Sequence, residues 1–334
     1  MREITGAQVR QAVEPFEAPS LARGITQIAT SIGLYMATVA AMYWTFGISY
    51  ALTLFLALAA SAFLVRVFIV QHDCGHGSFF ASKRGNDVLG AFCGALTLAP
   101  YAHWRRQHAG HHANWNNLDR RESGADIYSS CLTVAEYRAL SPGRRFLYRL
   151  WRHPVLANVF FPPLVFLLLY RTPFDTPKSW TRERRSVWMT NLAVLAEFLG
   201  LGLLLGFSKV LMVQLPIVFV TTVVGVWLFS VQHRFEDARW LRRNEWNFID
   251  AALGGSSYLA LPRILHWMTG NIGYHHIHHL SQRVPNYRLS DCHRDSPLLH
   301  PARPLTLARA FSAGRLTLWN EQSGRLVRFC DVKL

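Results

Sequence analysis

The sequence predicts an all-α integral membrane protein with four transmembrane helices, shorter re-entrant or interfacial helices, and a cytoplasmic histidine-rich cap that holds a di-metal site. Two observations on composition predict the membrane class. The 334 residues are 51% hydrophobic and only 16% charged, whereas soluble domains carry about 25% charged residues. The apolar residues also form runs long enough to cross a bilayer. Because repeats and linkers are not visible, residues 1–334 are interpreted as a single domain.

The first transmembrane element is expected to be a helical hairpin over residues 24–70, after a polar N-terminal segment over residues 1–23. Residues 24–65 contain no charged residue. This run is about twice the roughly 20 residues that one span needs, so we expect a turn near Gly47–Tyr50. A second hairpin is expected over residues 186–232, with Glu197 inside a span and a turn near Lys209.

Two shorter apolar segments, residues 88–104 and 154–170, have 17 residues each without charge. This length is at the lower limit for a span, and Pro162–Pro163 would remove helical hydrogen bonds from the second segment. Residues 113–153 carry seven Arg, and residues 171–185 carry four Arg and one Lys. Since cytoplasmic loops are rich in Lys and Arg, both regions are predicted to be cytoplasmic, and each short segment should dip into the membrane or lie flat on it.

This orientation places residues 71–185 and 233–334 on the cytoplasmic face. The net charge of +15 would also suit a nucleic-acid-binding protein, but such proteins cluster basic residues and exposed aromatics on a soluble domain. Here the arginines flank the spans, so no nucleic-acid partner is expected. Five cysteines that are distant in sequence argue against a disulfide framework and fit a reducing compartment.

Histidines recur at helical spacing in three boxes. His72 and His76 form an HxxxH box, and two HxxHH boxes follow at residues 108–112 and 275–279. Residues i, i+3 and i+4 of a helix share one face, so each box directs its imidazoles to one point. All three boxes fall on the predicted cytoplasmic side, as a shared site requires. Eight imidazoles are too many for one metal ion and suit two, although imidazole binds Zn, Cu, Fe and Ni alike.

His233, at the cytoplasmic end of the last span, is a ninth candidate ligand, and Glu236 is expected to orient it. The candidate catalytic residues are His72, His76, His108, His111, His112, His275, His278 and His279. The candidate metal ligands are these eight and His233.

Other polar and aromatic residues receive simpler interpretations. Asp73 and Cys74 are expected to pack or hydrogen bond around the first box, and His276 to support the third. The remaining histidines, expected in loops or at the interface, are His103, His153, His266, His293 and His300. An aromatic belt is expected to account for most of Trp44, Trp104, Trp115, Trp151 and Trp188. The run Asp119–Arg121 is interpreted as a solvated loop rather than a lipid-phosphate site.

Together, the motifs HDCGH, WRRQHAGHH and GNIGYHHIHHL resemble the three histidine boxes of the membrane fatty acid desaturases. The sequences QHRFE at residues 232–236 and VPNY at residues 284–287 resemble the acyl-lipid, omega-6/omega-3-like branch of that family. The resemblance runs from about His72 to Leu289.

This resemblance implies a non-haem di-iron centre with two Fe ions, dioxygen as oxidant and an acyl lipid as substrate. It implies desaturation of a fatty acyl chain, which introduces a cis double bond. The electrons would come from a separate small protein, either ferredoxin-like or cytochrome b5-like. A basic cytoplasmic face would attract such a partner if the partner is acidic. Membrane lipids would surround the spans.

Two alternatives stay open. Related hydroxylases and ketolases carry similar boxes, so the same centre would also suit hydroxylation or ketolation of a lipid. A non-enzymatic membrane metal-binding or transport protein would place its ligands inside the spans, whereas these histidines lie at the span ends.

Overall fold

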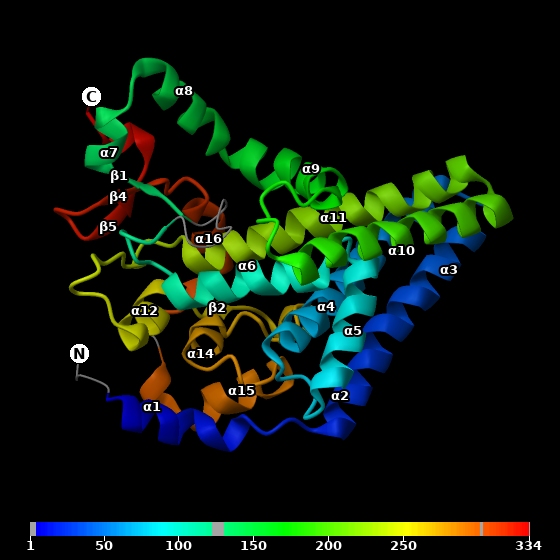
Figure 1. Cartoon of the computed structure of the whole chain (residues 1–334), viewed down its shortest axis with the longest axis horizontal. Coiled ribbons are helices and arrows are strands. Elements are labelled where there is room, and N and C mark those ends of the chain that lie inside the picture. The colour runs from blue at the N-terminus through cyan, green and yellow to red at the C-terminus, as the bar shows by residue number, and fades with distance from the viewer. Residues whose placement is uncertain (1–4, 122–129, 301–302, 334) are drawn as a thin grey trace.

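Long helices dominate the structure, a computed structural model that describes residues 5–121, 130–300 and 303–333 (Figure 1). Within these residues, four helical stretches are long and apolar enough to cross a membrane. They are α2, η2 and α3 together (Leu21–Thr45), α4 (Tyr50–His76), α10 (Thr181–Leu205) and α11 (Phe207–His233). The predicted number of candidate spans, four in two hairpins, is therefore confirmed by the length and composition of these helices.

Shorter elements surround these spans. The first stretch divides into α2 (Leu21–Ile28), η2 (Ala29–Gly33) and α3 (Leu34–Thr45). The other helices are α1 (Gly6–Val13), α5 (Lys83–Leu96), α6 (Tyr101–Asn114), α7 (Val134–Ala139), α8 (Pro142–Trp151), α9 (Phe161–Leu167), α12 (Phe248–Gly255), α13 (Arg263–Met268), α14 (His275–Leu280), α15 (Asn286–Asp295) and α16 (Leu307–Ala313). Single turns are η1 (Glu14–Phe16), η3 (Leu156–Phe160), η4 (Leu169–Arg171), η5 (Pro297–Leu299) and η6 (Phe329–Asp331).

Short strands tie the C-terminal region to the rest of the chain. They are β1 (Leu132–Thr133), β2 (Leu259–Ala260), β3 (Leu305–Thr306), β4 (Leu318–Asn320) and β5 (Arg325–Val327). β1 pairs in parallel with β4, which pairs antiparallel with β5, and β2 pairs in parallel with β3. These pairings join residues 132–133 to 318–319 and residues 259–260 to 305–306.

The first hairpin turns where the sequence predicts. α4 begins after Ser49, whose hydroxyl caps the helix by accepting a hydrogen bond from the backbone N of Leu52; such capping satisfies an otherwise unpaired donor. The second turn lies at Gly206, with φ +94°, three residues before the predicted Lys209. Only glycine readily adopts this φ, so Gly206 sets the boundary and Lys209 falls in the first turn of α11.

α4 is the central helix, with α3, α5 and α11 packed around it. Met42, Val67, Val70 and Ile217 are fully buried between these helices. Pro216 lies inside α11 and cannot donate to the carbonyl of Met212 one turn earlier. The Tyr50 hydroxyl donates to that carbonyl at 3.2 Å, so a neighbouring span satisfies the group that the proline leaves unpaired.

The two shorter apolar segments do not form single straight helices. Residues 88–104 belong to the end of α5 and the start of α6, which are separated by a turn in which Leu98 has φ +58°. Residues 154–170 form η3, α9 and η4, bent by 51° from α8. Pro162 and Pro163 lie at the start of α9, directly after the π turn η3, and such turns commonly accompany an interrupted helical hydrogen-bond ladder. Their depth in the membrane stays a prediction.

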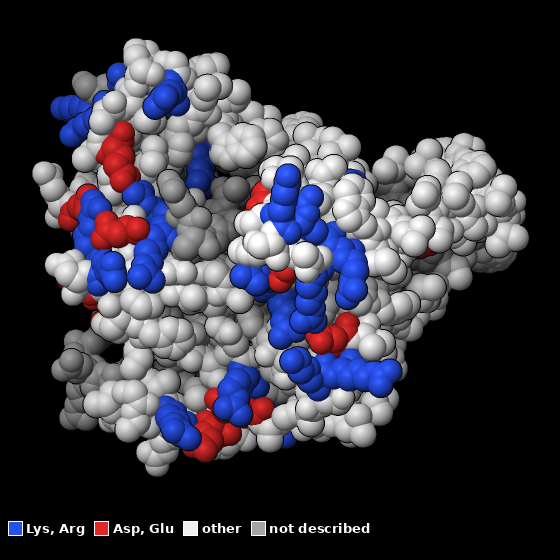
Figure 2. All heavy atoms as spheres, in the orientation of Figure 1, with Lys and Arg blue, Asp and Glu red and all other residues white. Residues whose placement is uncertain are grey.

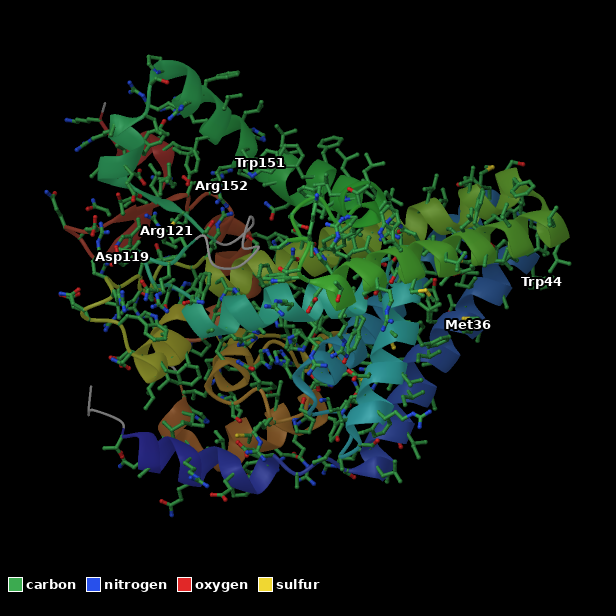
Figure 3. All side chains as sticks on the ribbon, viewed as in Figure 1. Met36, Trp44, Asp119, Arg121, Trp151 and Arg152 are labelled. Carbon is green, nitrogen blue, oxygen red and sulfur yellow. The ribbon has the colours of Figure 1, made fainter. Side chains whose placement is uncertain are left out.

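Charge is distributed unevenly over the molecule. In Figure 2, Lys, Arg, Asp and Glu gather over the cap, and the arm formed by the tips of α3, α10 and α11 is mostly uncharged. Figure 3 shows Met36 and Trp44 on this arm and Asp119, Arg121 and Arg152 at the opposite end. Trp44 is 73% exposed, as expected of a side chain at a lipid interface. The arm is therefore suited to hydrocarbon and the cap to water.

Candidate metal centre

The candidate site is built from the ends of four helices. His72 and His76 lie in the last two turns of α4, which ends because Gly77 adopts the left-handed conformation, with φ +73°. The sequence suggested that the first box follows the span. In the structure it is instead part of the span helix itself. His108, His111 and His112 lie at the end of α6, His233 is the last residue of α11, and His275, His278 and His279 lie in α14.

The structure brings all nine predicted histidines together in two adjacent groups. In the five-histidine group, nitrogen atoms of His72, His76, His108, His112 and His278 all lie within 4.8 Å of one another. In the three-histidine group, the same holds for His111, His233 and His279. The remaining histidine, His275, joins the second group, because its Nε2 lies 2.9 Å from Nε2 of His233. The groups touch where the rings of His112 and His279 stack at 4.2 Å.

Opposed nitrogen atoms show that this cluster fits a cation. Nε2 of His112 lies 3.1 Å from Nε2 of His108 and 3.0 Å from Nε2 of His278. Nε2 of His233 likewise lies 3.0 Å from that of His111 and 2.9 Å from that of His275. A neutral imidazole has one N–H and one lone pair, so nitrogens that converge in this way cannot all be satisfied by hydrogen bonds. A metal ion between them would accept the lone pairs, and two groups are compatible with two ions.

Burial also keeps the histidines of the cap in the neutral form that binds metals. Desolvation, followed by the neighbouring imidazoles, holds the pKa well below the ordinary value of 6.5 for His108, His112, His275, His278 and His279. A histidine with so low a pKa is uncharged at neutral pH, with one lone pair available. These five imidazoles are therefore available to a metal without losing protons.

A carboxylate orients the first box from outside the cluster. Oδ1 of Asp73 lies 3.1 Å from Nδ1 of His72, so it fixes the ring with Nε2 directed at the metal position. Its Oδ2 accepts hydrogen bonds from the backbone N and from Nδ2 of Asn286. The expectation that Asp73 hydrogen bonds around the first box is confirmed, and Cys74 packs in the buried core.

Glu236 does not orient His233, and that expectation is wrong. α11 ends at His233, and Arg234 leaves the helix with extended backbone angles, so the helical spacing on which the expectation rested does not continue. The Glu236 side chain is exposed and pairs with Arg309 at 3.4 Å. His276 is fully buried, but neither of its ring nitrogens has a hydrogen-bond partner among the described residues, so its supporting role stays a prediction.

Two histidines assigned to loops or to the interface are buried instead. Nε2 of His103 pairs with Asp175 at 3.0 Å, and Nε2 of His266 accepts a hydrogen bond from the backbone N of Leu261 at 3.3 Å. Asp119 and Arg121 are also paired within the protein, with Arg242 and Glu136 respectively, as a surface loop would be.

Two tryptophans assigned to the aromatic belt pack against the histidines. Trp104 stacks on His108 with ring centroids 4.5 Å apart, and the Trp115 ring lies 4.1 Å from that of His233. Both tryptophans are buried, whereas Trp44, Trp151 and Trp188 are exposed. The sequence did contain a signal for these contacts. Trp104 lies four residues before His108 and Trp115 lies three residues after His112, and residues at this helical spacing share a face.

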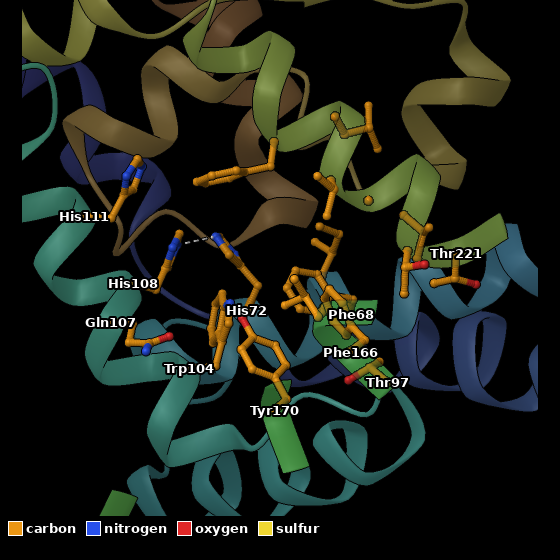
Figure 4. Close-up of a pocket in the computed structure, with 18 of the residues that line it drawn as sticks. Phe68, His72, Thr97, Trp104, Gln107, His108, His111, Phe166, Tyr170 and Thr221 are labelled. Atoms are coloured by element: carbon orange, nitrogen blue, oxygen red, sulfur yellow. Dashed lines mark hydrogen bonds between the residues drawn. The ribbon is translucent and has the colours of Figure 1, made fainter. Parts of the chain in front are cut away.

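An apolar cavity of about 370 Å³ opens beside the cluster. Figure 4 shows His72, His108 and His111 at one end of it and Thr221 at the other. Its walls come from α4, α9 and α11, with lining residues that include Val65, Phe68, Ile69, Val165, Phe166, Val226, Leu228 and Phe229. A cavity with these walls suits a hydrocarbon chain, and it leads to the histidine nitrogens.

Comparisons with known proteins agree with this geometry. The model of the fatty acid desaturase family matches residues 29–307. A fatty acid desaturase of Bacillus subtilis is 39% identical over 326 residues, which cover 98% of this chain and 91% of that protein. An sn-1 acyl-lipid omega-3 desaturase (ferredoxin) of Synechocystis is 30% identical over 67% of this chain and 61% of its own length. A chloroplastic omega-3 fatty acid desaturase of Glycine max is 31% identical over 67% of this chain and 49% of its own length. On the strength of the match across 29–307 and of the Bacillus relative, the chain belongs to the fatty acid desaturase family.

Proposed function

We propose that this protein introduces a cis double bond into the acyl chain of a membrane lipid, using dioxygen and two electrons from a separate protein. The observation that carries the proposal is the meeting of two histidine groups with the end of an apolar cavity. Dioxygen would take two hydrogens from the chain and two electrons and two protons from outside, and would leave as two waters. Membership of the desaturase family supports this reaction class.

Two iron ions are the proposed cofactor. The five-histidine group would hold one ion, and His111, His233, His275 and His279 would hold the other. When bound, the pair would supply an oxidant strong enough to break an unactivated C–H bond, which no side chain can do alone. All nine histidines are thus proposed ligands. The two hairpins and the cap that supply them are proposed to form a single domain.

The residues around the cavity would position the chain and exclude water. Phe68 and Phe166 form apolar walls of the cavity beside His72 (Figure 4). A chain held between them would keep one pair of methylenes beside the histidines, and such positioning accounts for a large part of the rate in many enzymes. The dry surroundings would also protect a reactive oxidant from water.

A cytoplasmic active site and a small electron-donor protein complete the proposal. Figure 2 shows Lys and Arg gathered over the ends of α5, α6 and α10. Arg105 and Arg182 both pair with Asp87, at 2.9 and 3.2 Å, and this contact holds the three helices together. The positive-inside rule supports a cytoplasmic position for this face. Its charge suits an acidic donor, and relatives from Synechocystis and Nostoc are named as ferredoxin desaturases.

The test is expression in a host whose lipids lack the product, followed by mass spectrometry of the acyl chains. The wild-type protein should produce a new double bond, and His111→Ala should produce none while inserting into the membrane in equal amount. His153→Ala is the matched control, because His153 is exposed in a loop and its loss should leave activity unchanged. A hydroxylated or ketolated product without a new double bond, or full activity of His111→Ala, would overturn the proposal.

A further inference from the structure

The cavity has two chemically different ends. Near the histidines it is lined by Gln107 and Asp175, and Nε2 of Gln107 donates to Oδ2 of Asp175 at 2.5 Å. Figure 4 shows Gln107 on the same side as His108, and Thr221 at the far end. Polar groups at one end favour the ester or head group of a lipid, so the apolar remainder of the chain would point toward Thr221.

Among the described residues, the two threonines at the far end offer a ligand no free hydroxyl hydrogen. The hydroxyls of Thr221 and Thr222 donate to the carbonyls of Ser61 and Phe219 at 3.5 and 3.1 Å. Since the protein already uses these hydrogens, the far end is suited to methylene and methyl groups.

Gly225 lies on α11 between the two ends of the cavity. It lines the cavity, and a Cβ built on it would meet no atom within 4 Å among the described residues. Because a helix rises about 1.5 Å per residue, Gly225 lies roughly 12 Å along α11 from His233, and Thr221 roughly 18 Å. A side chain at residue 225 would therefore divide the far part of the cavity from the histidines.

We propose that Gly225 is a specificity-determining residue that leaves room for the methyl-terminal part of the acyl chain. The inference rests on the proposed function and adds an orientation to it. The methyl end lies beside Thr221 and Thr222, and the length of cavity between them and the histidines decides which carbons are oxidised. A larger residue at 225 shortens that length. The carbons that lie beside the histidines are then closer to the methyl end of the acyl chain.

The first test compares Gly225→Leu with Gly200→Leu. Gly200 is also a helical glycine whose added Cβ would meet no atom within 4 Å, but it is exposed on α10 and away from the cavity. Leu favours helix more than Gly at both positions. The double-bond position in the product should move toward the methyl end in Gly225→Leu alone. Because one methylene that no longer fits a hydrophobic pocket changes selectivity about tenfold or more, the ratio of shifted to unshifted product should rise by at least about that factor.

A second test needs no metal. A palmitate analogue with a diazirine at its methyl end is photolysed with the metal-free protein, and the labelled peptide is identified by mass spectrometry. Label should fall on residues 221–226 in the wild type and in Gly200→Leu, and should be lost from them in Gly225→Leu. Label near Gln107, or equal double-bond positions in both leucine variants, would overturn this inference. A wild type that forms no double bond would instead contradict the proposed function.

Discussion

Asp73 and Asn286 are joined by two hydrogen bonds across 213 residues of sequence. Oδ2 of Asp73 accepts from the backbone N of Asn286 at 2.6 Å and from its Nδ2 at 2.7 Å. Oδ1 of the same carboxylate lies 3.1 Å from Nδ1 of His72, and Gln27 donates to Oδ1 of Asn286 at 2.8 Å. One buried carboxylate thus connects the first histidine box, the first span and the segment that follows the third box.

Replacing this carboxylate with an amide should weaken the metal centre. In Asp73→Asn the charge that orients His72 is lost, and the new amide cannot accept all the hydrogen bonds that the carboxylate accepts. Loss of such an outer partner costs about 10- to 100-fold in metal affinity or activity. Iron content and product yield should fall together, while Asp331→Asn, an exposed carboxylate paired with Arg328, should change neither. Equal iron content in the two variants would show that Asp73 does not position the ligand.

Arg66 should be important for stability, because it ties α4 to two other segments. It is 4% exposed, its Nε donates to Oγ of Ser31 at 3.2 Å, and its guanidinium donates to the Trp267 carbonyl and lies 4.1 Å from the Trp267 ring. Arg66→Met would leave the Trp267 carbonyl without this donor, at a cost of about 1–3 kcal/mol. Thermal unfolding in detergent should show a lower Tm, and Arg66→Lys should restore part of the difference.

The matched control for Arg66 is Arg243→Met. Arg243 is exposed, and surface substitutions generally change stability by less than about 0.5 kcal/mol. A Tm decrease of equal size in both variants would refute a specific role for Arg66.

Acid should destabilise the metal-free protein from near-neutral pH downward. Burial lowers the pKa of His276 to about 3 and, with the neighbouring His300, that of His293 to about 4. Below the ordinary pKa of 6.5 the unfolded chain binds protons that the folded chain does not, so the free energy of unfolding decreases as pH falls from about 6.5 toward about 4. The Tm should be flat above about pH 7 and should drop below about pH 6. A Tm that rises on acidification would contradict this assignment.

Local spacing made much of the site predictable from sequence. The HxxxH and HxxHH patterns identify eight histidines, because i, i+3 and i+4 positions share a helix face regardless of the rest of the fold. His233 has no such pattern and was found only from its place at the end of a span. The spans were predictable because charge-free length is itself the physical requirement.

Long-range contacts account for what the sequence did not reveal. The hydrogen bonds between Asp73 and Asn286 depend on how distant segments pack, and the same is true of the contact between Trp115 and His233. Glu236 was misassigned because closeness in sequence to His233 does not fix where its side chain points once α11 has ended, and its partner Arg309 is distant in sequence. The extent of the cavity also depends on α4, α9 and α11 together, so no single segment predicts its lining.

The most direct test of the central claim is the number and position of iron ions in the purified protein. Metal analysis combined with anomalous diffraction at the iron absorption edge measures both. The account predicts two irons per chain, one within the five-histidine group and one among His111, His233, His275 and His279. A single iron, or two irons bound away from these histidines, would contradict it.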